Sequence, residues 1–480
     1  MTRTAKVQDV VIGSGAGGAV VAARLAEAGR TVLLLEEGPR VSKADFNQRE
    51  GDMYALLYRD AGGQSTADGA ISVMQGRCLG GSTTINMGDV VPIHDAVLAH
   101  WRTRHGWGDW GGVTDRDVHT AADRAQRDMG AGPIPEGLVN TANRKLREGA
   151  ETLGLANEVL HHNRTGCIGS GYCLIGCAYD AKKGTHLSYV PRFEAAGGEV
   201  WCDSRVDRLE PGAVVGAGFR VEAERTFVCA GTVHTPGILG RSGLGGARLG
   251  EHLTLQPQGP VLAVFDQRID LHRGIPQSWA IVGPLEHSEE RGLGGYTIEG
   301  VAGGPAMTAS MMPLPMKELR PFLSRFRQAA AALCLVPDQP SGRVVWSGAR
   351  PTIEYEATAE YTARLREALT TGCRAYLAAG ATEVILPVVG GKPMRTERDL
   401  AAIADLPLRT CDLSMISAHP QGTCRMGPDA GSSVVGMDFK VHGSEDVYVC
   451  DASLFPTSAS THTMVPVMTM AHLLANQLTA

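Results

Sequence analysis

The segment VQDVVIGSGAGGAVVAARLAEAGRTVLLLEEG, residues 7–38, is the feature that most restricts how this chain can fold. It alternates a buried β-run, a glycine-rich turn, a helix and a second β-run, which together make a βαβ unit. Gly13 permits the tight turn, Gly15 lets the backbone approach a pyrophosphate, and Gly18 lets the helix lie close to the strand. Glu36 ends the second strand, where a carboxylate accepts hydrogen bonds from an adenosine ribose. The segment therefore predicts a dinucleotide-binding domain, and the alternative is a glycine-rich turn without a ligand.

The length of the chain predicts a second folding unit. At 480 residues the chain exceeds what one hydrophobic core usually serves, so we expect two units, which need not be contiguous in sequence. Two β-runs at residues 343–346 and 352–355, followed by a helical stretch at 359–379, predict a mixed layer of sheet and helix in the middle of the chain.

The distribution of charge and of apolar residues narrows the possible partners. The 45 basic and 51 acidic residues are well mixed, and no basic stripe could follow a phosphate backbone, which argues against a nucleic-acid partner. No apolar run is long enough to span a bilayer, and the N-terminus enters the glycine motif without a cleavable leader. We therefore expect a cytoplasmic protein with no transmembrane segment.

Two further glycine motifs follow the βαβ unit. In QGRCLGGSTTINMG, residues 75–88, a glycine pair precedes Ser82 and Thr83 and offers backbone N–H groups to an anion. The run TFVCAGTVHTPGILGRSG, residues 226–243, indicates a strand, a glycine turn and the start of a helix. The first of these motifs therefore predicts a second contact with a bound anion.

The C-terminal part contains two more compact motifs, each with a histidine. SAHPQGTCRMG, residues 417–427, holds His419, and VYVCDASLFPTSASTHTMVPVMTMAHLLANQL, residues 447–478, holds His462. Both histidines stand beside glycine or small polar residues. A lone histidine is more often structural than catalytic, so spacing alone does not assign either of them a role.

Taken together, these motifs resemble the glucose-methanol-choline (GMC) family of flavin oxidoreductases. The resemblance rests on the N-terminal fingerprint, GRCLGGSTTIN, CAGTVHTPGIL, HPQGTCRMG and CDASLFPTS, in that order along nearly the whole chain. It implies an α/β fold, with a discontinuous Rossmann-type FAD-binding domain and a substrate-binding domain made of a mixed or antiparallel sheet and helices. A nicotinamide enzyme on a similar nucleotide fold does not account for the C-terminal motifs.

The resemblance also implies domain boundaries. The FAD-binding domain is expected to comprise residues 1–94, 185–255 and 411–480. The substrate-binding domain is expected to comprise residues 95–184 and 256–410, with a cysteine-rich insertion at 161–184.

Roles for individual residues follow from the same resemblance. His419 is implied as the catalytic base and His462 as the second active-site residue, while Asn86 would face the flavin and Asp451 the ribityl-pyrophosphate part. The full set of implied cofactor-binding residues is Gly13, Gly15, Ala16, Gly18, Glu36, Arg77, Gly80, Gly81, Ser82, Asn86, Val206, Ala230, Asp451, Ala452 and Thr463, with the backbone near Val206 at the adenine.

Two positions depart from patterns found in the family. Some members attach the flavin through a histidine just before the asparagine of the second glycine motif, but this chain has Ile85 there, which implies non-covalent FAD. The run LGEHLTLQP carries His252, Leu255 and Gln256 where the family has an asparagine-and-histidine pattern, which affects local loop contacts.

The implied chemistry is oxidation of an alcohol CH–OH group to a carbonyl, as in an alcohol oxidase or dehydrogenase. The reaction removes a proton from oxygen and a hydride from carbon, and flavin N5 takes only the hydride, so a base must take the proton. A neutral His419 can accept it, while His462 holds the same oxygen. The partners would be a small-molecule alcohol and either oxygen or an electron-acceptor protein. The alternatives are a redox-silent lyase on the same scaffold and a flavin-binding electron-relay subunit.

The run CIGSGYCLIGC places Cys167, Cys173 and Cys177 within eleven residues. Three thiolates are one short of a tetrahedral zinc site or a four-cysteine cluster. The spacing resembles a segment of membrane-linked bacterial glucose and fructose dehydrogenases of the same family, which holds a three-iron cluster, and a related segment of long-chain alcohol oxidases, which usually has a further cysteine at the place of Ser170. Three interpretations stay open: an iron–sulfur cluster that passes electrons to a partner protein, reduced structural thiols, and a disulfide or zinc site.

Overall fold

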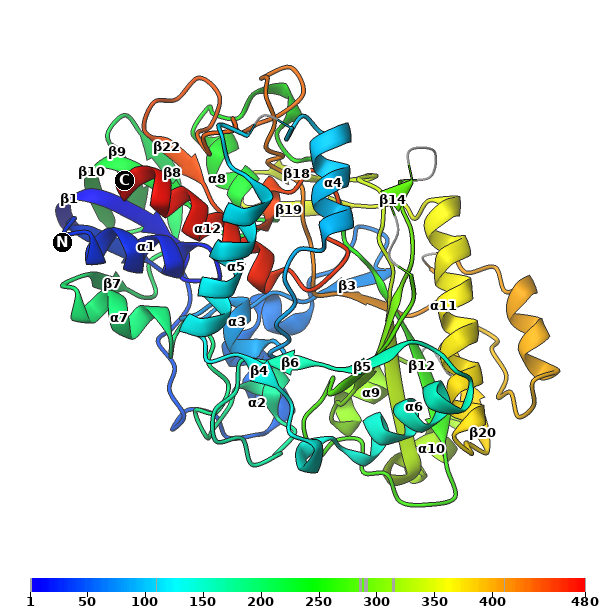
Figure 1. Ribbon diagram of the computed structural model, residues 1–480. Coiled ribbons are helices and arrows are strands. Elements are labelled where there is room, and N and C mark those ends of the chain that lie inside the picture. Colours follow the sequence, from blue (N-terminus) through cyan, green and yellow to red (C-terminus); the bar gives the residue numbers. More distant parts are fainter. Residues whose placement is uncertain are drawn as a thin grey trace.

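The computed structural model describes residues 2–479 except 109, 285–286, 289–291, 313–315 and 410. A seven-stranded sheet carries the N-terminal βαβ unit, at the left of Figure 1. Its strands, in spatial order, are β7 (Glu199–Trp201), β2 (Val32–Leu35), β1 (Arg3–Ile12), β10 (Phe219–Val228), β9 (Ala213–Gly216) and β8 (Val206–Glu210), and β22 (Val447–Val449) also pairs with β10. Strands β7, β2, β1, β10 and β22 run parallel, and β9 and β8 extend the sheet antiparallel. Three distant parts of the sequence therefore build this one sheet.

Helices cover this sheet because its central strands are apolar on both faces. The four residues of β2 are all buried, as are the last four of β1, which is typical of a parallel sheet between helical layers. Helix α1 (Gly18–Glu27) packs against α7 (Tyr189–Ala195) and α12 (Met464–Thr479), and α12 also packs against α5 (Asp115–Asp128). The predicted Rossmann-type unit is confirmed, with α1 and α12 both beside the strands in Figure 1.

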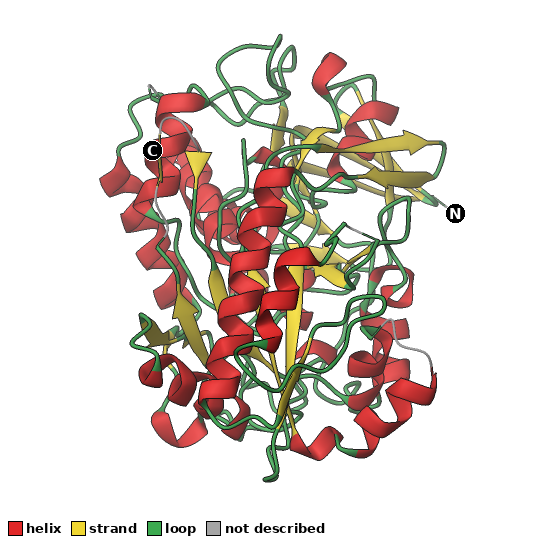
Figure 2. Ribbon diagram, turned by 90° about the vertical axis from the view of Figure 1, so that its right-hand side faces the viewer, coloured by secondary structure: helices red, strands yellow, loops and turns green. Residues whose placement is uncertain are grey.

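A second sheet of eight strands forms the other half of the molecule. Its order is β3 (Ile71–Val73), β21 (Met415–Ser417), β12 (Gln258–Val264), β17 (Ala329–Leu335), β16 (Thr297–Val301), β13 (Trp279–Val282) and β5 (Asn157–Val159), and β20 (Glu383–Ile385) also pairs with β12. The strands pair antiparallel except β3 with β21. Helices α6 (Thr141–Thr152) and α11 (Ala359–Ala378) pack on the sheet, and Figure 2 views the side where α11 lies, with helices in front of strands.

The predicted elements in the middle of the chain occur, but they are arranged differently from a single layer. The helix predicted at 359–379 is α11, and the two predicted strands are β18 (Gly342–Ser347) and β19 (Arg350–Glu354). These strands pair with β11 (Glu251–Leu253) in a separate three-stranded sheet rather than joining the eight-stranded one. The domain boundaries stay a prediction. Strands β3 and β21 come from segments assigned to the FAD-binding domain, but they pair with each other within the second sheet.

Apart from short 3-10 helices, the remaining described elements are short strands and connecting α-helices. They are β4 (Gly132–Pro133) with β6 (His161–His162), β14 (His287–Ser288) with β15 (Gly292–Leu293), and helices α2 (Glu50–Leu57), α3 (Ser82–Ile85), α4 (Asp95–Arg104), α8 (Thr235–Arg241), α9 (Pro305–Ser310) and α10 (Met316–Ser324). Within the described ranges, none of the helices has the length and apolar character needed to cross a lipid bilayer.

Candidate active site

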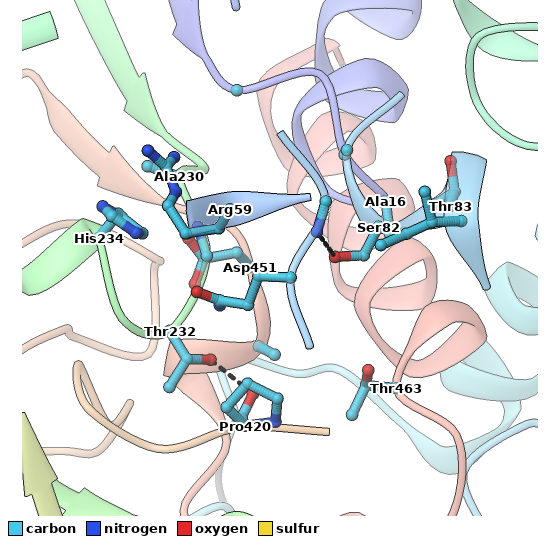
Figure 3. A pocket seen from close by; sticks show the side chains of 18 of the residues that line it. Ala16, Arg59, Ser82, Thr83, Ala230, Thr232, His234, Pro420, Asp451 and Thr463 are labelled. Carbon is cyan, nitrogen blue, oxygen red and sulfur yellow. Dashed lines mark hydrogen bonds between the residues drawn. The ribbon is translucent and has the colours of Figure 1, made fainter. Parts of the chain in front are cut away.

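A large cavity lies at the carboxyl ends of the parallel strands β2, β1, β10 and β22. The turns that follow these strands form one wall, and residues of β12, β17 and β21 from the second sheet form another. Open parallel sheets bind their ligands in this position. Figure 3 shows side chains gathered around the opening, with Ala16 and Ser82 from the two glycine motifs and Ala230 and Asp451 from turns after strands.

The two N-terminal glycine motifs meet at this cavity and leave room for a ligand. Gly13 has a φ of 99°, and a Cβ there would lie 2.4 Å from the carbonyl oxygen of Cys229. Gly15 lines the cavity, and a Cβ on it would meet no atom within 4 Å. A Cβ on Gly81 would lie 3.1 Å from the Cα of Gly15. A side chain at Gly15 would thus project into the space that a pyrophosphate needs, beside the N-terminus of α1.

Glu36 lines the cavity, and its carboxylate accepts hydrogen bonds mainly from residues of the neighbouring turns. Its Oε2 accepts from the backbone N–H of Ser14 at 3.1 Å and from the Ser14 hydroxyl at 2.5 Å, and its Oε1 accepts from Gly38 N–H at 2.8 Å. Burial raises the pKa of Glu36 although these bonds favour the ionised form. A carboxylate offers about four acceptor positions, so one remains for a ribose hydroxyl.

Asn86 and Asp451 approach the cavity from two different elements. The Asn86 side-chain N–H donates to Met464 Sδ at 3.2 Å, whereas its Oδ1 is buried without a hydrogen-bond partner among the described residues. Asp451 accepts from Gly231 N–H at 2.9 Å and from the Thr235 hydroxyl at 2.6 Å, and burial raises its pKa. The orphaned Asn86 oxygen fits a bound ring with N–H groups, since a buried acceptor without a partner is costly.

Most residues predicted to bind the cofactor line the cavity, namely Gly13, Gly15, Ala16, Glu36, Gly81, Ser82, Asn86, Val206, Ala230, Asp451, Ala452 and Thr463, and so do both predicted catalytic histidines, His419 and His462. Gly18, Arg77 and Gly80 do not line it. A Cβ on Gly18 would lie 1.9 Å from the oxygen of Gly13, so this glycine serves helix packing. The Gly80 N–H donates to Ser14 Oγ at 2.8 Å, and Arg77 Nε lies 3.7 Å from Glu37 Oε1, so both stabilise the turns behind the wall.

Sequence reasoning missed several polar residues of the wall. Arg59 donates two hydrogen bonds of 2.6 Å each to Glu37, and this pairing lowers the Glu37 pKa although burial alone would raise it. His234 stands edge-on to Trp346, with ring centroids 5.4 Å apart, and burial lowers its pKa to about 3. Glu37 and His234 lie inside recognisable motifs, but Arg59 and Trp346 come from segments with no nucleotide-binding pattern.

His419 is held as a neutral imidazole at the edge of the cavity. Its Nδ1 lies 2.7 Å from Gln256 Oε1 and 3.3 Å from Gln258 Nε2. An amide oxygen only accepts, so the shorter contact assigns the proton to Nδ1 and leaves Nε2 able to accept one. Burial, together with the nearby charge of His462, lowers the pKa of His419 well below its usual value. Gln256, which departs from the family pattern, is therefore the residue that orients this histidine.

His462, in contrast to His419, is held as a protonated imidazolium. Its ring stands edge-on to His419 with centroids 4.9 Å apart, and its Nε2 lies 3.0 Å and 2.9 Å from the two carboxylate oxygens of Glu299. Burial alone would lower the pKa of His462, but the carboxylates of Glu299 and Asp89 outweigh it and raise the value to about 9. At neutral pH the site therefore pairs a neutral imidazole with an imidazolium.

A buried polar network continues behind His462. Asp89, Glu299 and His462 place one ligand-type atom each within 4.8 Å of one another, and Asp89 Oδ1 lies 2.6 Å from His162 Nε2. Arg164 Nε donates to His162 Nδ1 at 2.7 Å. The acceptor role of Nδ1 and the lowered pKa of His162, caused by burial, assign a neutral ring. Glu299 and Asp89 thus serve as counter-ions for His462.

The cysteine segment lies beside this network. Arg164 donates to Cys173 Sγ at 3.0 Å, and the buried Lys182 donates to the Cys173 carbonyl oxygen at 2.8 Å. Burial lowers the pKa of Lys182 to about 8. None of the three cysteines is in a disulfide, and they do not form a group of ligand atoms within 4.8 Å of one another. That spacing does not match a mononuclear zinc site, whose four ligands lie close together.

The same segment reaches the wall of the cavity. Leu174, which follows Cys173, lines the cavity, and its carbonyl oxygen accepts from the hydroxyl of Tyr58 at 2.6 Å. Tyr58 also lines the cavity. The segment is therefore in contact with the space in which a cofactor would lie.

Family models for GMC oxidoreductases match residues 54–258 and 338–471, and a model for an NAD(P)-binding Rossmann-like domain matches residues 11–57. An uncharacterized GMC-type oxidoreductase of Mycobacterium tuberculosis is 34% identical over 98% of this chain and 75% of its own length. Long-chain-alcohol oxidase FAO4B of Arabidopsis thaliana is 26% identical over 98% of this chain and 67% of its own length. The structure of pyridoxine 4-oxidase from Mesorbium loti superposes with a TM-score of 0.69 at 19% identity, covering 98% of this chain and 99% of the other.

The family models together cover more than half of the chain, and a relative above 30% identity matches nearly all of it. The two GMC models contain the second glycine motif and both histidines that line the cavity, and the Rossmann-like model contains the first glycine motif. The chain belongs to the GMC oxidoreductase family, as its five ordered motifs predict.

Proposed function

We propose that the protein binds FAD non-covalently and oxidises the CH–OH group of a small-molecule alcohol to a carbonyl, with His419 as the base. The observation that carries this proposal is the pair of histidines of opposite charge state at one edge of the cavity. Relatives that are named as long-chain-alcohol and pyridoxine oxidases support the choice of an alcohol. The predicted cytoplasmic location stays a prediction.

The residues divide the work on the alcohol oxygen between them. His419 Nε2 would take the hydroxyl proton, because Gln256 already occupies Nδ1. His462, as a cation, would stabilise the negative charge that develops on the oxygen as the proton leaves. FAD, when bound, supplies the acceptor for the hydride released from carbon. Oxygen or an electron-acceptor protein would then take the electrons.

Two observations support non-covalent FAD as the cofactor. The open space beside Gly15 and the buried Asn86 oxygen without a hydrogen-bond partner fit a dinucleotide with a ring system. Ile85 precedes Asn86 and has no nucleophilic atom, so this position offers no side chain for a covalent bond. Acid precipitation should therefore leave the flavin in the supernatant.

Anaerobic addition of alcohols to the purified protein tests the proposal. An alcohol that is a substrate should bleach the flavin absorption, because its hydride reduces the cofactor and no external acceptor reoxidises it. Loss of colour separates an oxidoreductase from the redox-silent lyase, which would cleave a cyanohydrin without bleaching. A flavin-bearing protein that no alcohol in a broad panel bleaches and that does not cleave a cyanohydrin would instead favour the electron-relay subunit.

For the cysteine segment we propose an iron–sulfur cluster held by Cys167, Cys173 and Cys177. The supporting observation is charge, because Arg164 and the buried Lys182 both contact Cys173, and among the described residues their hydrogen-bond acceptors are carbonyl oxygens, an imidazole and a thiol rather than carboxylates. One buried and one partly buried cation suit the negative charge of a thiolate-bound cluster better than they suit neutral packing thiols. Contact of Leu174 with the cavity would place the cluster where it can take electrons from the flavin.

Iron and acid-labile sulfide assays on anaerobically purified protein measure the content of iron–sulfur cluster directly. A full three-iron cluster should give a near-stoichiometric ratio of iron to sulfide, and Cys173→Ser should lose both while the yellow flavin remains. Iron below about a tenth of an equivalent per chain, with flavin present, would exclude the cluster, because a structural metal site should be close to full occupancy.

A further inference from the structure

A second, smaller cavity lies next to the active-site cavity. Met307, Leu333 and Ile416 line both cavities, so the two cavities adjoin along this wall. Apart from Thr308, the described side chains around the second cavity are aliphatic or methionine, and none of these described residues is aromatic. The active-site cavity therefore adjoins a second space whose lining is largely apolar.

The register of the second sheet explains where this space begins. Successive residues of a strand point to opposite faces, so Gln258, Pro260 and Leu262 of β12 share one face. Pro260 pairs with Leu333 and Leu262 pairs with Ala331 of β17. The face is polar at Gln258, which contacts His419, and apolar from Pro260 onward. At roughly 3.3 Å per residue, the face extends about 13 Å from Gln258 to Leu262.

Strand β16 repeats the same change of polarity. Glu299, the partner of His462, pairs with Leu333, and Val301 pairs with Ala331 two residues further along. Leu333 and Leu262 are 2% and 5% exposed, which makes this part of the face dry. A molecule lying along this face would therefore meet the polar side chains of the described strands β12 and β16 at the histidine end.

Helix α9 and the residues that follow it cover the apolar space. Met307, Met311 and Met312 line it, and their unbranched, flexible side chains adapt to an aliphatic chain. The start of α9 is fixed to α2, because the carboxylate of Glu50 accepts from Ala306 N–H at 3.2 Å and Met307 N–H at 3.1 Å. The cover is thus anchored at one end and lined with adaptable side chains.

We propose that the second cavity binds the aliphatic chain of the substrate, so that the protein prefers straight-chain primary alcohols whose hydroxyl lies at His419. This inference rests on the proposed alcohol oxidation and adds the substrate class to it. The apolar chain follows the face from Pro260 to Leu262 and Ala331, under α9. Each methylene that enters the cavity leaves water, which strengthens binding about fourfold.

The test compares the holoenzyme with straight-chain alcohols from butan-1-ol to decan-1-ol. Calorimetry should show that Kd falls about fourfold per added methylene until the cavity is full, and kcat/KM for anaerobic flavin reduction should rise in parallel. Met311→Gln places an amide of similar size in the apolar wall, so the longer alcohols should lose at least about tenfold in Kd, whereas butan-1-ol should change little. Met316→Gln, at a methionine that is 70% exposed outside the cavity, is the matched control.

The outcomes separate the two proposals. If alcohols bleach the flavin but neither Kd nor kcat/KM depends on chain length, the aliphatic cavity is wrong and alcohol oxidation stands. If Kd depends on chain length and responds to Met311→Gln but no alcohol bleaches the flavin, the cavity stands and the proposed oxidation fails. If Met311→Gln and Met316→Gln change the profile equally, the site is not where we place it.

Discussion

Replacing His419 by alanine should slow anaerobic flavin reduction by an alcohol by about two to four orders of magnitude, the usual contribution of a positioned general base. The variant keeps the cavity but loses the imidazole that lies beside the cationic His462 and has a free acceptor position. Stopped-flow spectroscopy of the flavin band measures the rate in a single turnover. The flavin content of the variant, from its visible spectrum, must match the wild type for the comparison to count.

A histidine outside the site provides the control. His119 on α5 has a side chain that is 48% exposed, so His119→Ala should reduce the flavin at the wild-type rate. Near-normal flavin reduction by His419→Ala would overturn the assignment of the base. A loss of rate in both variants would point to a general effect on folding.

The N-terminal half of the nucleotide unit could be predicted from the sequence because its signals are local. The glycine turn, α1 and β2 follow one another within residues 7–38, and the pattern of apolar residues fixes each of them. Helix α11 was predictable for the same reason, since its period extends over five turns. The family membership and the α/β fold with a Rossmann-type unit are confirmed predictions.

Long-range pairing set the limit of what the sequence could predict. Strands β3 and β21 are three residues each and separated by more than 340 residues, so no local pattern indicates that they pair. The strands β18 and β19 were predictable as strands, but their neighbour β11 was not, because a turn pattern does not specify which edge a hairpin joins.

The electrostatics of the active site illustrates the same limit. Glu299 lies within TIEGV, which has the pattern of a buried strand with one acid, and its partner His462 is 163 residues away. Gln256 could be noted only as a departure from a family pattern, although it sets the tautomer of His419. The sequence could therefore nominate both histidines, but their opposite charge states depend on residues that only the fold brings together.

Replacing Glu299 by glutamine should reduce flavin reduction at pH 8 by about two to three orders of magnitude, comparable to removing one donor to a developing oxyanion. Glutamine keeps the shape of the side chain but removes the more strongly acting of the two carboxylate charges, Glu299 and Asp89, that hold the pKa of His462 at about 9. Burial then dominates and lowers that pKa, so His462 is neutral at pH 8 and no longer offers a cation to the substrate oxygen. Rates measured across pH with the same alcohol give the comparison.

The sign of the pH dependence makes this prediction specific to charge. In the wild type the cationic His462 persists below its pKa, so kcat/KM should fall as pH rises through about 9. His419 has a lowered pKa and is already a neutral base at neutral pH, so its titration should not change kcat/KM in that range. In Glu299→Gln the falling limb should move to lower pH, and the variant should regain much of the wild-type rate in acid, where His462 is protonated again.

The same shift should appear in stability. Because the folded pKa of His462 is raised, its pairing with Glu299 contributes stability that is fully present below the unfolded value of about 6.5 and is lost as pH rises through about 9. The Tm difference between wild type and Glu299→Gln should therefore be largest at pH 6 and shrink toward pH 10. Glu356→Gln, at an exposed glutamate of the same half of the molecule, should show neither effect. If Glu299→Gln is slow at every pH and its kcat/KM falls over the same pH range as in the wild type, Glu299 acts through packing rather than through the charge of His462.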